Sequence, residues 1–184
     1  MRVISGKAKG RRLKMVPGDS TRPILDRIKE NLFNILGPWV SGTRWLDLFA
    51  GTGQVGIEAL SRGAEHVLFT EIDRQAIDVI NHNLELTGLQ AGAEVRREDA
   101  FRMLAREPDE GFEVIFIAPP QYKGLWKKAL EAIDAQPEWV YPDGLVIVQI
   151  DPKEWEEVSL DHLELFDERR YGKTLLLFYE RPGG

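Results

Sequence analysis

Short apolar runs alternate with longer amphipathic stretches along most of this 184-residue chain. Val67-Leu68-Phe69 and Val114-Ile115-Phe116-Ile117 are continuous apolar runs, which are typical of central strands in a parallel sheet covered on both faces. Regular alternation of such strands with helices favours an α/β, doubly wound fold. The pattern predicts strands near residues 44–49, 66–71, 93–97, 112–118 and 144–150, and helices near 53–62, 74–87, 100–106 and 123–135.

The two ends of the chain carry different patterns. Residues 163–168 and 174–180 flank a polar stretch that contains Gly172, which predicts an antiparallel hairpin and brings the mostly parallel sheet to seven strands. Residues 1–16 alternate basic and apolar groups, which predicts one or two short strands. We therefore expect a basic β extension over residues 1–20 and an α/β domain over residues 21–184. The domain starts with a helix near 25–36, whose apolar face comprises Ile28, Leu32, Ile35 and Leu36.

The charge is distributed unevenly. The chain has a net charge of −6, but residues 1–31 hold nine Lys and Arg against three Asp and Glu. A basic segment on an acidic body indicates an anionic partner, most simply nucleic acid. The alternative is a solvated charged face, or a segment that pairs with its own acidic body. The candidate nucleic-acid-binding residues are Arg2, Lys7, Lys9, Arg11, Arg12, Lys14, Arg22, Arg27 and Lys29.

Composition narrows the possible functions. Cysteine is absent, so disulfides, cysteine nucleophiles and thiolate metal sites are excluded. The three histidines have no metal-ligand spacing, and we expect no metal. No apolar run approaches about 18 residues and no secretory signal is recognisable, so we expect a cytoplasmic protein that does not bind membranes.

A glycine-rich turn and a distant acid form the most informative motif. Gly51 and Gly53 follow the strand near 44–49, and Glu71 lies twenty residues after Gly51, at the end of the next strand. Glycines allow the backbone to approach a ligand closely, and the acid is placed to accept hydrogen bonds from two ribose hydroxyls. With Gly56 the motif also fits the dinucleotide fingerprint, and the simplest alternative is a tight strand–helix turn without a ligand.

Two more acids point to the kind of nucleoside. Asp47 ends the first strand, where a cofactor with a free ammonium group needs a carboxylate, and S-adenosylmethionine carries such a group. Asp99 is placed to accept from the adenine amine, with the Ala100 N–H facing the ring, although Asp99 also fits the N-cap of the following helix. The expected cofactor-binding residues are Asp47, Phe49, Ala50, Gly51, Thr52, Gly53, Glu71, Ile72, Asp99 and Ala100.

The loop after the fourth strand contains the candidate catalytic residues. Two prolines remove backbone N–H donors and fix the chain, so that nearby carbonyls are available to accept hydrogen bonds from a substrate amine. An aromatic residue can stack on a planar base, and Tyr122, Phe33 and Trp126 are candidates. The alternative is a rigid loop without chemistry. The candidate catalytic residues are Ala118, Pro119, Pro120, Gln121 and Tyr122.

Several motifs are spread along nearly the whole chain, and they include Arg2-Val3-Ile4-Ser5-Gly6, Thr21-Arg22-Pro23, Leu46-Asp47-Leu48-Phe49-Ala50-Gly51-Thr52-Gly53 and Arg170-Tyr171-Gly172-Lys173-Thr174. These motifs resemble those of the bacterial 16S ribosomal RNA guanine-N2 methyltransferases. The resemblance implies a class I S-adenosylmethionine-dependent methyltransferase fold, Rossmann-like, and action on ribosomal RNA in an assembling small subunit. The small size of the basic extension suggests help from ribosomal proteins, and we expect a monomer.

One departure from the family pattern concerns catalysis. The family usually carries Asp or Asn before the two prolines and an aromatic residue after them, whereas this chain has Ala118 and Gln121, with Tyr122 one place later. In the usual mechanism the side chain at the first position accepts a hydrogen bond from the guanine amine. Losing one such bond costs about 1–3 kcal/mol, which an enzyme can survive. The backbone carbonyls of Ala118 and Pro119, or the Gln121 amide, are candidate replacements.

The sequence leaves other functions open. A catalytically weakened, RNA-binding relic of the family would keep the basic segment and lack turnover. An NAD-dependent oxidoreductase would share the glycine turn and Glu71, but it would not explain Asp47, the Pro-Pro loop or the basic segment. A methyltransferase acting on a small molecule or a protein amine would not need that basic segment.

Overall fold

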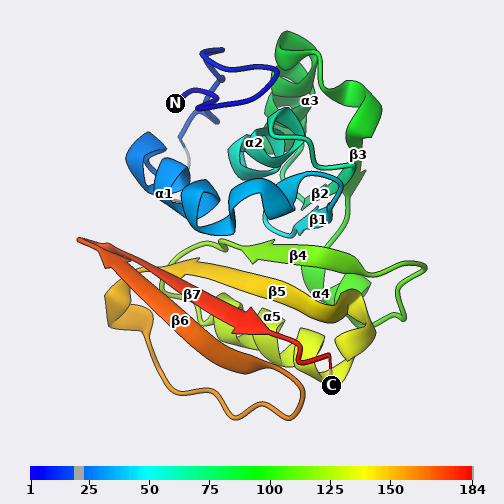
Figure 1. Cartoon of the computed structure of the whole chain (residues 1–184), viewed down its shortest axis with the longest axis vertical. Helices are drawn as coiled ribbons and strands as arrows, with labels where there is room; N and C mark the ends of the chain where they lie inside the picture. Colours follow the sequence, from blue (N-terminus) through cyan, green and yellow to red (C-terminus); the bar gives the residue numbers. More distant parts are fainter. Residues whose placement is uncertain (19–22, 184) are drawn as a thin grey trace.

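The computed structural model describes residues 1–18 and 23–183, and over these residues a seven-stranded sheet forms the centre of the molecule (Figure 1). The strand order is β3-β2-β1-β4-β5-β7-β6, and β7 is the strand that runs antiparallel to its neighbours β5 and β6. The expected doubly wound, mostly parallel sheet is confirmed. The strands are β1 (Arg44–Asp47), β2 (His66–Glu71), β3 (Ala93–Arg97), β4 (Phe112–Ile117), β5 (Val140–Ile150), β6 (Glu164–Tyr171) and β7 (Thr174–Glu180).

Helices cover both faces of the sheet. Val114 and Phe116 of β4 pack with apolar residues of α1, α2 and α3, whereas Ile115 and Ile117 pack with those of α4 and α5. This two-residue alternation explains why β4 is continuously apolar from Val114 to Ile117. The helices are α1 (Asp26–Leu36), α2 (Gln54–Ser61), α3 (Arg74–Thr87), α4 (Ala100–Leu104) and α5 (Leu125–Ala135), with 3-10 helices η1 (Gly37–Val40), η2 (Gln90–Gly92), η3 (Pro137–Trp139) and η4 (Pro152–Glu154).

The N-terminal segment forms less strand than its pattern predicts. A single antiparallel bridge joins Arg2 to Arg12, because several backbone groups between them bond to α2 or form local turns instead of a ladder. Ser61 of α2 accepts from Lys7 N through its carbonyl and from Ala8 N through its hydroxyl, at 2.8 and 2.9 Å. Val3, Ala8 and Leu13 are buried in the core formed with α1 to α3.

Two predicted boundaries shift for identifiable reasons. Strand β5 begins at Val140 rather than near residue 144, because the turn-like Pro142-Asp143-Gly144 stretch is incorporated into the strand. Asp143 N donates to Arg181 O at 2.7 Å and Arg181 N donates to Gly144 O at 3.1 Å, which holds this irregular stretch against the C-terminal segment. Strand β6 continues to Tyr171, which pairs with Thr174, so the turn to β7 comprises only Gly172 and Lys173.

Among the described residues, no helix combines the length and apolar character required to cross a bilayer.

Candidate active site at the carboxyl edge of the sheet

The carboxyl ends of β1, β2 and β4 lie side by side, and the loop after β1 occupies the space above them. Asp47 is level with Phe69 of β2 and with Phe116 of β4. The loop turns sharply because Gly51 and Gly53 have φ values of 56° and 78°, which favour glycine. Gly56 follows in α2, and a Cβ there would lie 2.3 Å from the Phe69 ring. Gly56 therefore allows α2 to pack closely on the sheet.

Glu71 organises the loop from the neighbouring strand. Its Oε1 accepts from Gly51 N at 3.2 Å, and its Oε2 accepts from Ile72 N at 2.7 Å and Asp73 N at 3.0 Å. The carboxylate thus fixes the glycine turn and the start of the next loop together. Each carboxylate oxygen has two acceptor sites, so Oε1 keeps one site for a ligand hydroxyl group.

Asp99 caps α4 at the opposite wall of the same region. Its Oδ1 accepts from Phe101 N at 2.9 Å and Arg102 N at 3.0 Å. A cavity of about 370 Å³ lies between this cap and Glu71, and Phe49, Gly51, Ile72 and Ala100 also line it. The cavity is large enough for a nucleoside, with carboxylates at two sides and apolar groups between them.

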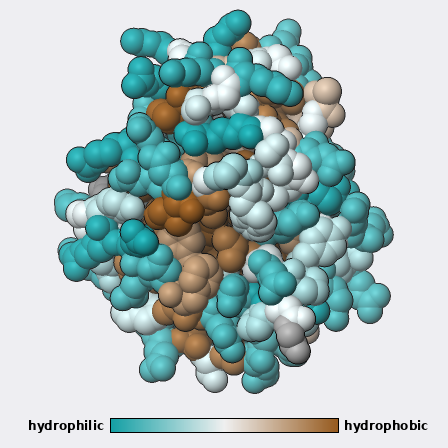
Figure 2. Space-filling view, in the orientation of Figure 1, coloured by the Kyte–Doolittle hydropathy of each residue, from teal (hydrophilic) through white to brown (hydrophobic). Residues whose placement is uncertain are grey.

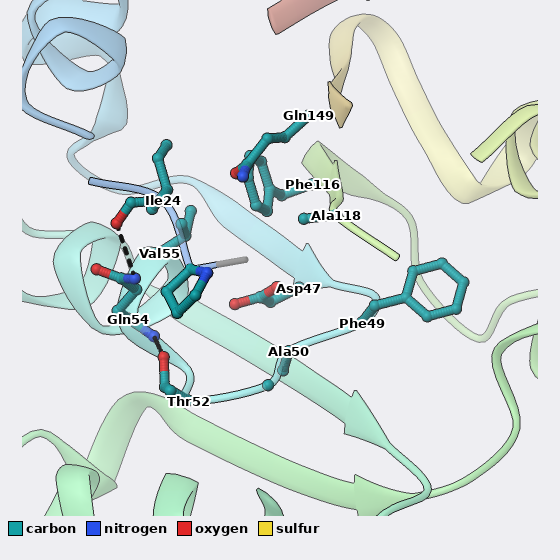
Figure 3. A pocket seen from close by; sticks show the side chains of 12 residues that line it. Ile24, Asp47, Phe49, Ala50, Thr52, Gln54, Val55, Phe116, Ala118 and Gln149 are labelled. Atoms are coloured by element: carbon teal, nitrogen blue, oxygen red, sulfur yellow. Dashed lines mark hydrogen bonds between the residues drawn. The ribbon is translucent and has the colours of Figure 1, made fainter. Parts of the chain in front are cut away.

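Asp47 is almost completely buried and lines a second, smaller cavity of about 40 Å³ (Figure 3). Burial raises the pKa of Asp47 to about 7, although Gly56 N donates to its Oδ2 at 3.2 Å and partly offsets this. Ala50 and Thr52 line the same cavity. Phe49 and Gly51 line both cavities, so the two cavities adjoin. Gly53 lines neither of them and instead closes the turn through Gly53 N, which donates to Ala50 O at 2.7 Å.

The Pro-Pro loop connects the two cavities. Ala118 lines the smaller one and Pro120 lines the larger one. Gln121 is partly buried and lies in neither lining. Tyr122 is 63% exposed and has a φ of 63°. Its hydroxyl donates to Asp151 Oδ2 at 2.5 Å, and its N–H donates to Glu154 Oε1, so η4 holds the end of the loop.

The prediction that Phe33 or Trp126 stacks on the substrate base is wrong. Phe33 is buried and stacks on Trp45 with ring centroids 5.4 Å apart, so it belongs to the core. Trp126 is also buried and stacks on Trp155. Helix periodicity alone does not distinguish these aromatic residues from exposed ones. Tyr122 remains as the exposed aromatic residue of the three.

The basic residues separate into exposed and buried ones. The prediction that Lys29 contacts nucleic acid is wrong, because its side chain has no exposed surface. Its ammonium group donates to Arg2 O at 2.7 Å and to Gln54 Oε1 at 3.1 Å. Arg2 pairs with Asp26 at 3.9 Å. Arg22 lies outside the described residues. The exposed ones are Arg2, Lys7, Lys9, Arg11, Arg12, Lys14 and Arg27.

Several residues of the site were not predicted. Gln149 of β5 and Gln54 of α2 line the smaller cavity, and Phe101 of α4 lines the larger one next to Phe49. Asn83 of α3 is buried and donates to both Lys14 O and Thr52 O at 3.0 Å, which ties the N-terminal segment to the glycine turn. Gln149 lies near the carboxyl end of a predicted strand, as Asp47 does, so its polar character marks it as a candidate, although its place beside Ala118 depends on strand register.

In the part of the chain that the structure describes, no three His, Asp or Glu side chains gather in a way that would hold a metal ion.

The model of the protein family described as Conserved hypothetical protein 95 matches residues 1–180. The chain belongs to this family. Over 185 residues it is 42% identical to "Putative rRNA methyltransferase YlbH" from Bacillus subtilis (strain 168), with 100% of each chain covered. Over 182 residues it is 34% identical to Ribosomal RNA small subunit methyltransferase D from Haemophilus influenzae, covering 98% of this chain and 93% of that protein.

Solved structures agree with this membership of the Conserved hypothetical protein 95 family. The structure named "Putative methyltransferase yhhF from Escherichia coli" superposes with a TM-score of 0.87 and 30% identity, covering 100% of this chain and 99% of that one. The resemblance to ribosomal RNA methyltransferases is therefore confirmed, and so is the class I methyltransferase fold.

Proposed function

We propose that this chain transfers a methyl group from S-adenosylmethionine to the exocyclic N2 of a guanine in 16S ribosomal RNA. The observation that supports this most is the junction of the two cavities at Phe49 and Gly51. The larger cavity suits a nucleoside, and the smaller one lies between a buried carboxylate and the loop at Ala118. A cofactor that extends through the junction would bring its reactive centre to that loop.

The cofactor's binding groups follow from the residues around each cavity. Glu71 would bind a ribose hydroxyl through Oε1, and Asp99 with Ala100 N–H would bind the adenine edge. Phe49 and Ile72 would contact the flat faces of the adenine. Asp47 would pair with the ammonium group, whose positive charge favours the ionised carboxylate. When bound, S-adenosylmethionine supplies an electrophilic methyl group on a sulfonium ion, with no need for a metal.

The chain's own contribution to the reaction is orientation. Guanine N2 is a weak base because its lone pair is delocalised, so acceptors must hold its protons and turn the lone pair toward the methyl group. The backbone carbonyl of Pro119 would accept one of those two protons, and Tyr122 would stack on a base that has left its helix. Methyl transfer would form the N2–C bond and break the S–C bond of the sulfonium ion, which would leave neutral S-adenosylhomocysteine, and one N2 proton would pass to solvent.

The exposed basic residues of the N-terminal segment would hold the RNA backbone. Lys7, Lys9 and Lys14 are exposed on a segment whose apolar residues are anchored in the core, so their charges have a fixed position. The names of the relatives support ribosomal RNA as the partner. We further propose that the chain acts as a monomer in the cytoplasm, on an assembling small subunit that includes ribosomal proteins.

The test is mass mapping of small-subunit RNA after reaction of the purified protein with hypomethylated particles and labelled S-adenosylmethionine. We expect one N2-methylguanine per particle with the unmodified protein, and loss of product with Glu71→Ala. Absence of product with the unmodified protein would contradict the proposal. RNA binding without product would instead favour the second candidate, a catalytically weakened, RNA-binding relic of the family. It is the second candidate because Ala118 has no side-chain acceptor.

Calorimetry separates this proposal from an NAD-dependent oxidoreductase. We expect S-adenosylhomocysteine to bind and NAD to give no heat, because a nicotinamide cofactor has no ammonium group to pair with Asp47. Binding of NAD in preference to S-adenosylhomocysteine would reverse the assignment.

A further inference from the structure

Gln149 lies beside Ala118 at the carboxyl edge of the sheet. Strands β4 and β5 run parallel with Ile117 level with Val148, so the next residues along the two strands, Ala118 and Gln149, are neighbours. Ile117 and Val148 face α4 and α5, and the following residues therefore face the opposite side, toward the small cavity. Gln149 is only 8% exposed, although its side chain is polar.

Asp47, Ala118 and Gln149 line the same small cavity, and Figure 3 shows the Gln149 amide reaching over Phe116 from β5. Three other polar side chains line this cavity, and they make hydrogen bonds within the protein; Gln149 also interacts within the protein. Thr52 Oγ1 accepts from Gln54 N, and Gln54 binds Ile24 O and Lys29. Asp47 accepts from Gly56 and would take the cofactor's ammonium group.

We propose that Gln149 is a catalytic residue whose Oε1 accepts a hydrogen bond from the guanine N2 amine. This rests on the proposed function. An amide oxygen from β5 would do what the methyl side chain of Ala118 cannot do from β4. It is uncharged, so it orients the amine without adding a second carboxylate next to Asp47. The Gln149 Nε2 group additionally provides a donor, which a guanine O6 or the surrounding backbone can accept.

The experiment replaces Gln149 by Met, which keeps the length and volume of the side chain and removes the amide. In single-turnover methyl transfer, Gln149→Met should be slower on the order of tenfold to a hundredfold, because one oriented hydrogen bond is lost. The Kd for S-adenosylhomocysteine should not change. In the double variant with Ala118→Asn, an acceptor returns from the neighbouring strand, and the rate should recover at least tenfold.

The outcomes are distinct. A Gln149→Met variant that turns over as fast as the unmodified protein overturns the assignment. A loss of rate that Ala118→Asn does not recover also overturns it, since the defect would then concern packing. If the unmodified protein forms no N2-methylguanine, the proposed function itself fails, and this assignment fails with it.

A second, independent observation concerns a groove of about 760 Å³ between the start of α1 and the β6–β7 turn. Figure 1 shows the tip of that hairpin on the same side of the molecule as α1. Leu25 lines the groove and is 57% exposed, and the exposed basic residues Arg27 and Lys173 also line it. Pro23 and Ile24 line both this groove and the small cavity, so the groove leads to the candidate active site.

The geometry points to the groove as the site for the nucleotide next to the target guanine. Its apolar floor with Tyr171 suits a base, and Arg27 and Lys173 suit the flanking phosphates. The acid of the groove, Asp26, already pairs with Arg2. This inference also rests on the proposed function. Neither Tyr171 nor Lys173 was among the residues predicted to bind RNA.

Two variants test the groove without threatening the fold. Leu25 is the N-cap of α1 and makes no side-chain cap, so Leu25→Ser supplies one and should keep or raise the melting temperature. It should lower kcat/KM for RNA on the order of tenfold through the loss of base contact. Lys173→Ala should reduce the salt dependence of RNA binding by about one counterion relative to Lys127→Ala. Lys127 is the control because it lies on α5, away from the groove, where it pairs with Glu156.

Equal salt slopes for Lys173→Ala and Lys127→Ala would overturn the assignment. A loss seen only with protein-containing particles, and not with naked RNA, would also overturn it and assign the groove to a protein partner. Inactivity of the unmodified protein would contradict the proposed function. The salt dependence of RNA binding would still show whether Lys173 in the groove contacts the RNA.

Discussion

Lys29 Nζ lies 3.6 Å from a carboxylate oxygen of Glu58, and neither side chain exposes any surface to solvent. Glu58 also accepts from the N–H groups of Ile4 and Ser5, at 2.9 and 3.1 Å. The pair thus fastens the N-terminal segment to α1 and α2. Burial lowers the pKa of Lys29, and the attraction of Glu58 opposes that shift. A lysine of the basic segment therefore serves the fold.

Replacement of Lys29 separates structure from RNA binding. Lys29→Met should lower the free energy of unfolding by about 1–3 kcal/mol, because Glu58 loses one of its two cations and keeps Arg62, whose Nε lies 2.8 Å away. Lys9→Ala should leave stability unchanged, since Lys9 is exposed, and should reduce the salt dependence of RNA binding by about one counterion. Urea unfolding and RNA titrations at several salt concentrations measure both effects. A stable Lys29→Met protein with weakened RNA binding would contradict this division.

Asp47 should make cofactor affinity depend on pH. Its pKa of about 7 means that half of the free protein holds a proton there at neutral pH. The cofactor's ammonium group favours the ionised form, so below pH 7 the Kd for S-adenosylhomocysteine should rise about tenfold per pH unit. Calorimetry from pH 5.5 to 8 measures this. Asp47→Asn should bind weakly with little pH dependence; a variant that keeps the full dependence would show that another group is responsible.

The ionised Asp47 carboxylate should lower the stability of the folded protein in the absence of cofactor. Its pKa is raised from an ordinary value of 3.8, so the folded state holds the proton more tightly than the unfolded state. The stabilisation from that proton is complete below pH 4 and is lost as the pH rises through 7. Asp47→Asn should consequently melt at a higher temperature than the unmodified protein at pH 8, with little difference at pH 4. A lower melting temperature for the variant at pH 8 would contradict the burial argument.

Tyr122 should affect turnover through its ring. The ring is exposed at the end of the Pro-Pro loop, and its hydroxyl bonds to Asp151. Tyr122→Ala should lower kcat by about fivefold to a hundredfold, because base stacking contributes about 1–3 kcal/mol, with little change in cofactor affinity. Tyr122→Phe keeps the ring and should retain most of the activity. If the Ala variant loses turnover and cofactor affinity equally, Tyr122 supports the loop and does not hold the base.

The sheet and the glycine loop could be predicted because their signals are local. Continuous apolar runs identified β2 and β4, and the glycines with Glu71 identified the turn and the strand end beside it. What could not be predicted depends on pairs of residues far apart in sequence. Whether Lys29 is exposed depends on Glu58, and whether Phe33 is exposed depends on Trp45.

The candidate active site shows the same limit. Asp47 and Ala118 follow strands with clear patterns, and both were predicted to line the site. Gln149 was missed because its place beside Ala118 depends on the register between β4 and β5, which an apolar pattern does not determine. The extent of strand in residues 1–16 was overestimated for a related reason. Alternation of basic and apolar residues does not reveal that some backbone groups bond to a helix.

Asn83 should couple the N-terminal segment to the cofactor turn. Its side chain accepts from Lys14 N at 2.7 Å and donates to Lys14 O and Thr52 O. Asn83→Ala should destabilise the protein by about 2 kcal/mol, because it leaves partly buried backbone groups without partners. It should also weaken binding of S-adenosylhomocysteine, since Thr52 belongs to the turn that lines the small cavity. Asn81→Ala, at an exposed position of the same helix, is the matched control. Thermal unfolding and calorimetry on both variants measure the coupling, and it is absent if Asn83→Ala loses stability while its cofactor affinity equals that of Asn81→Ala.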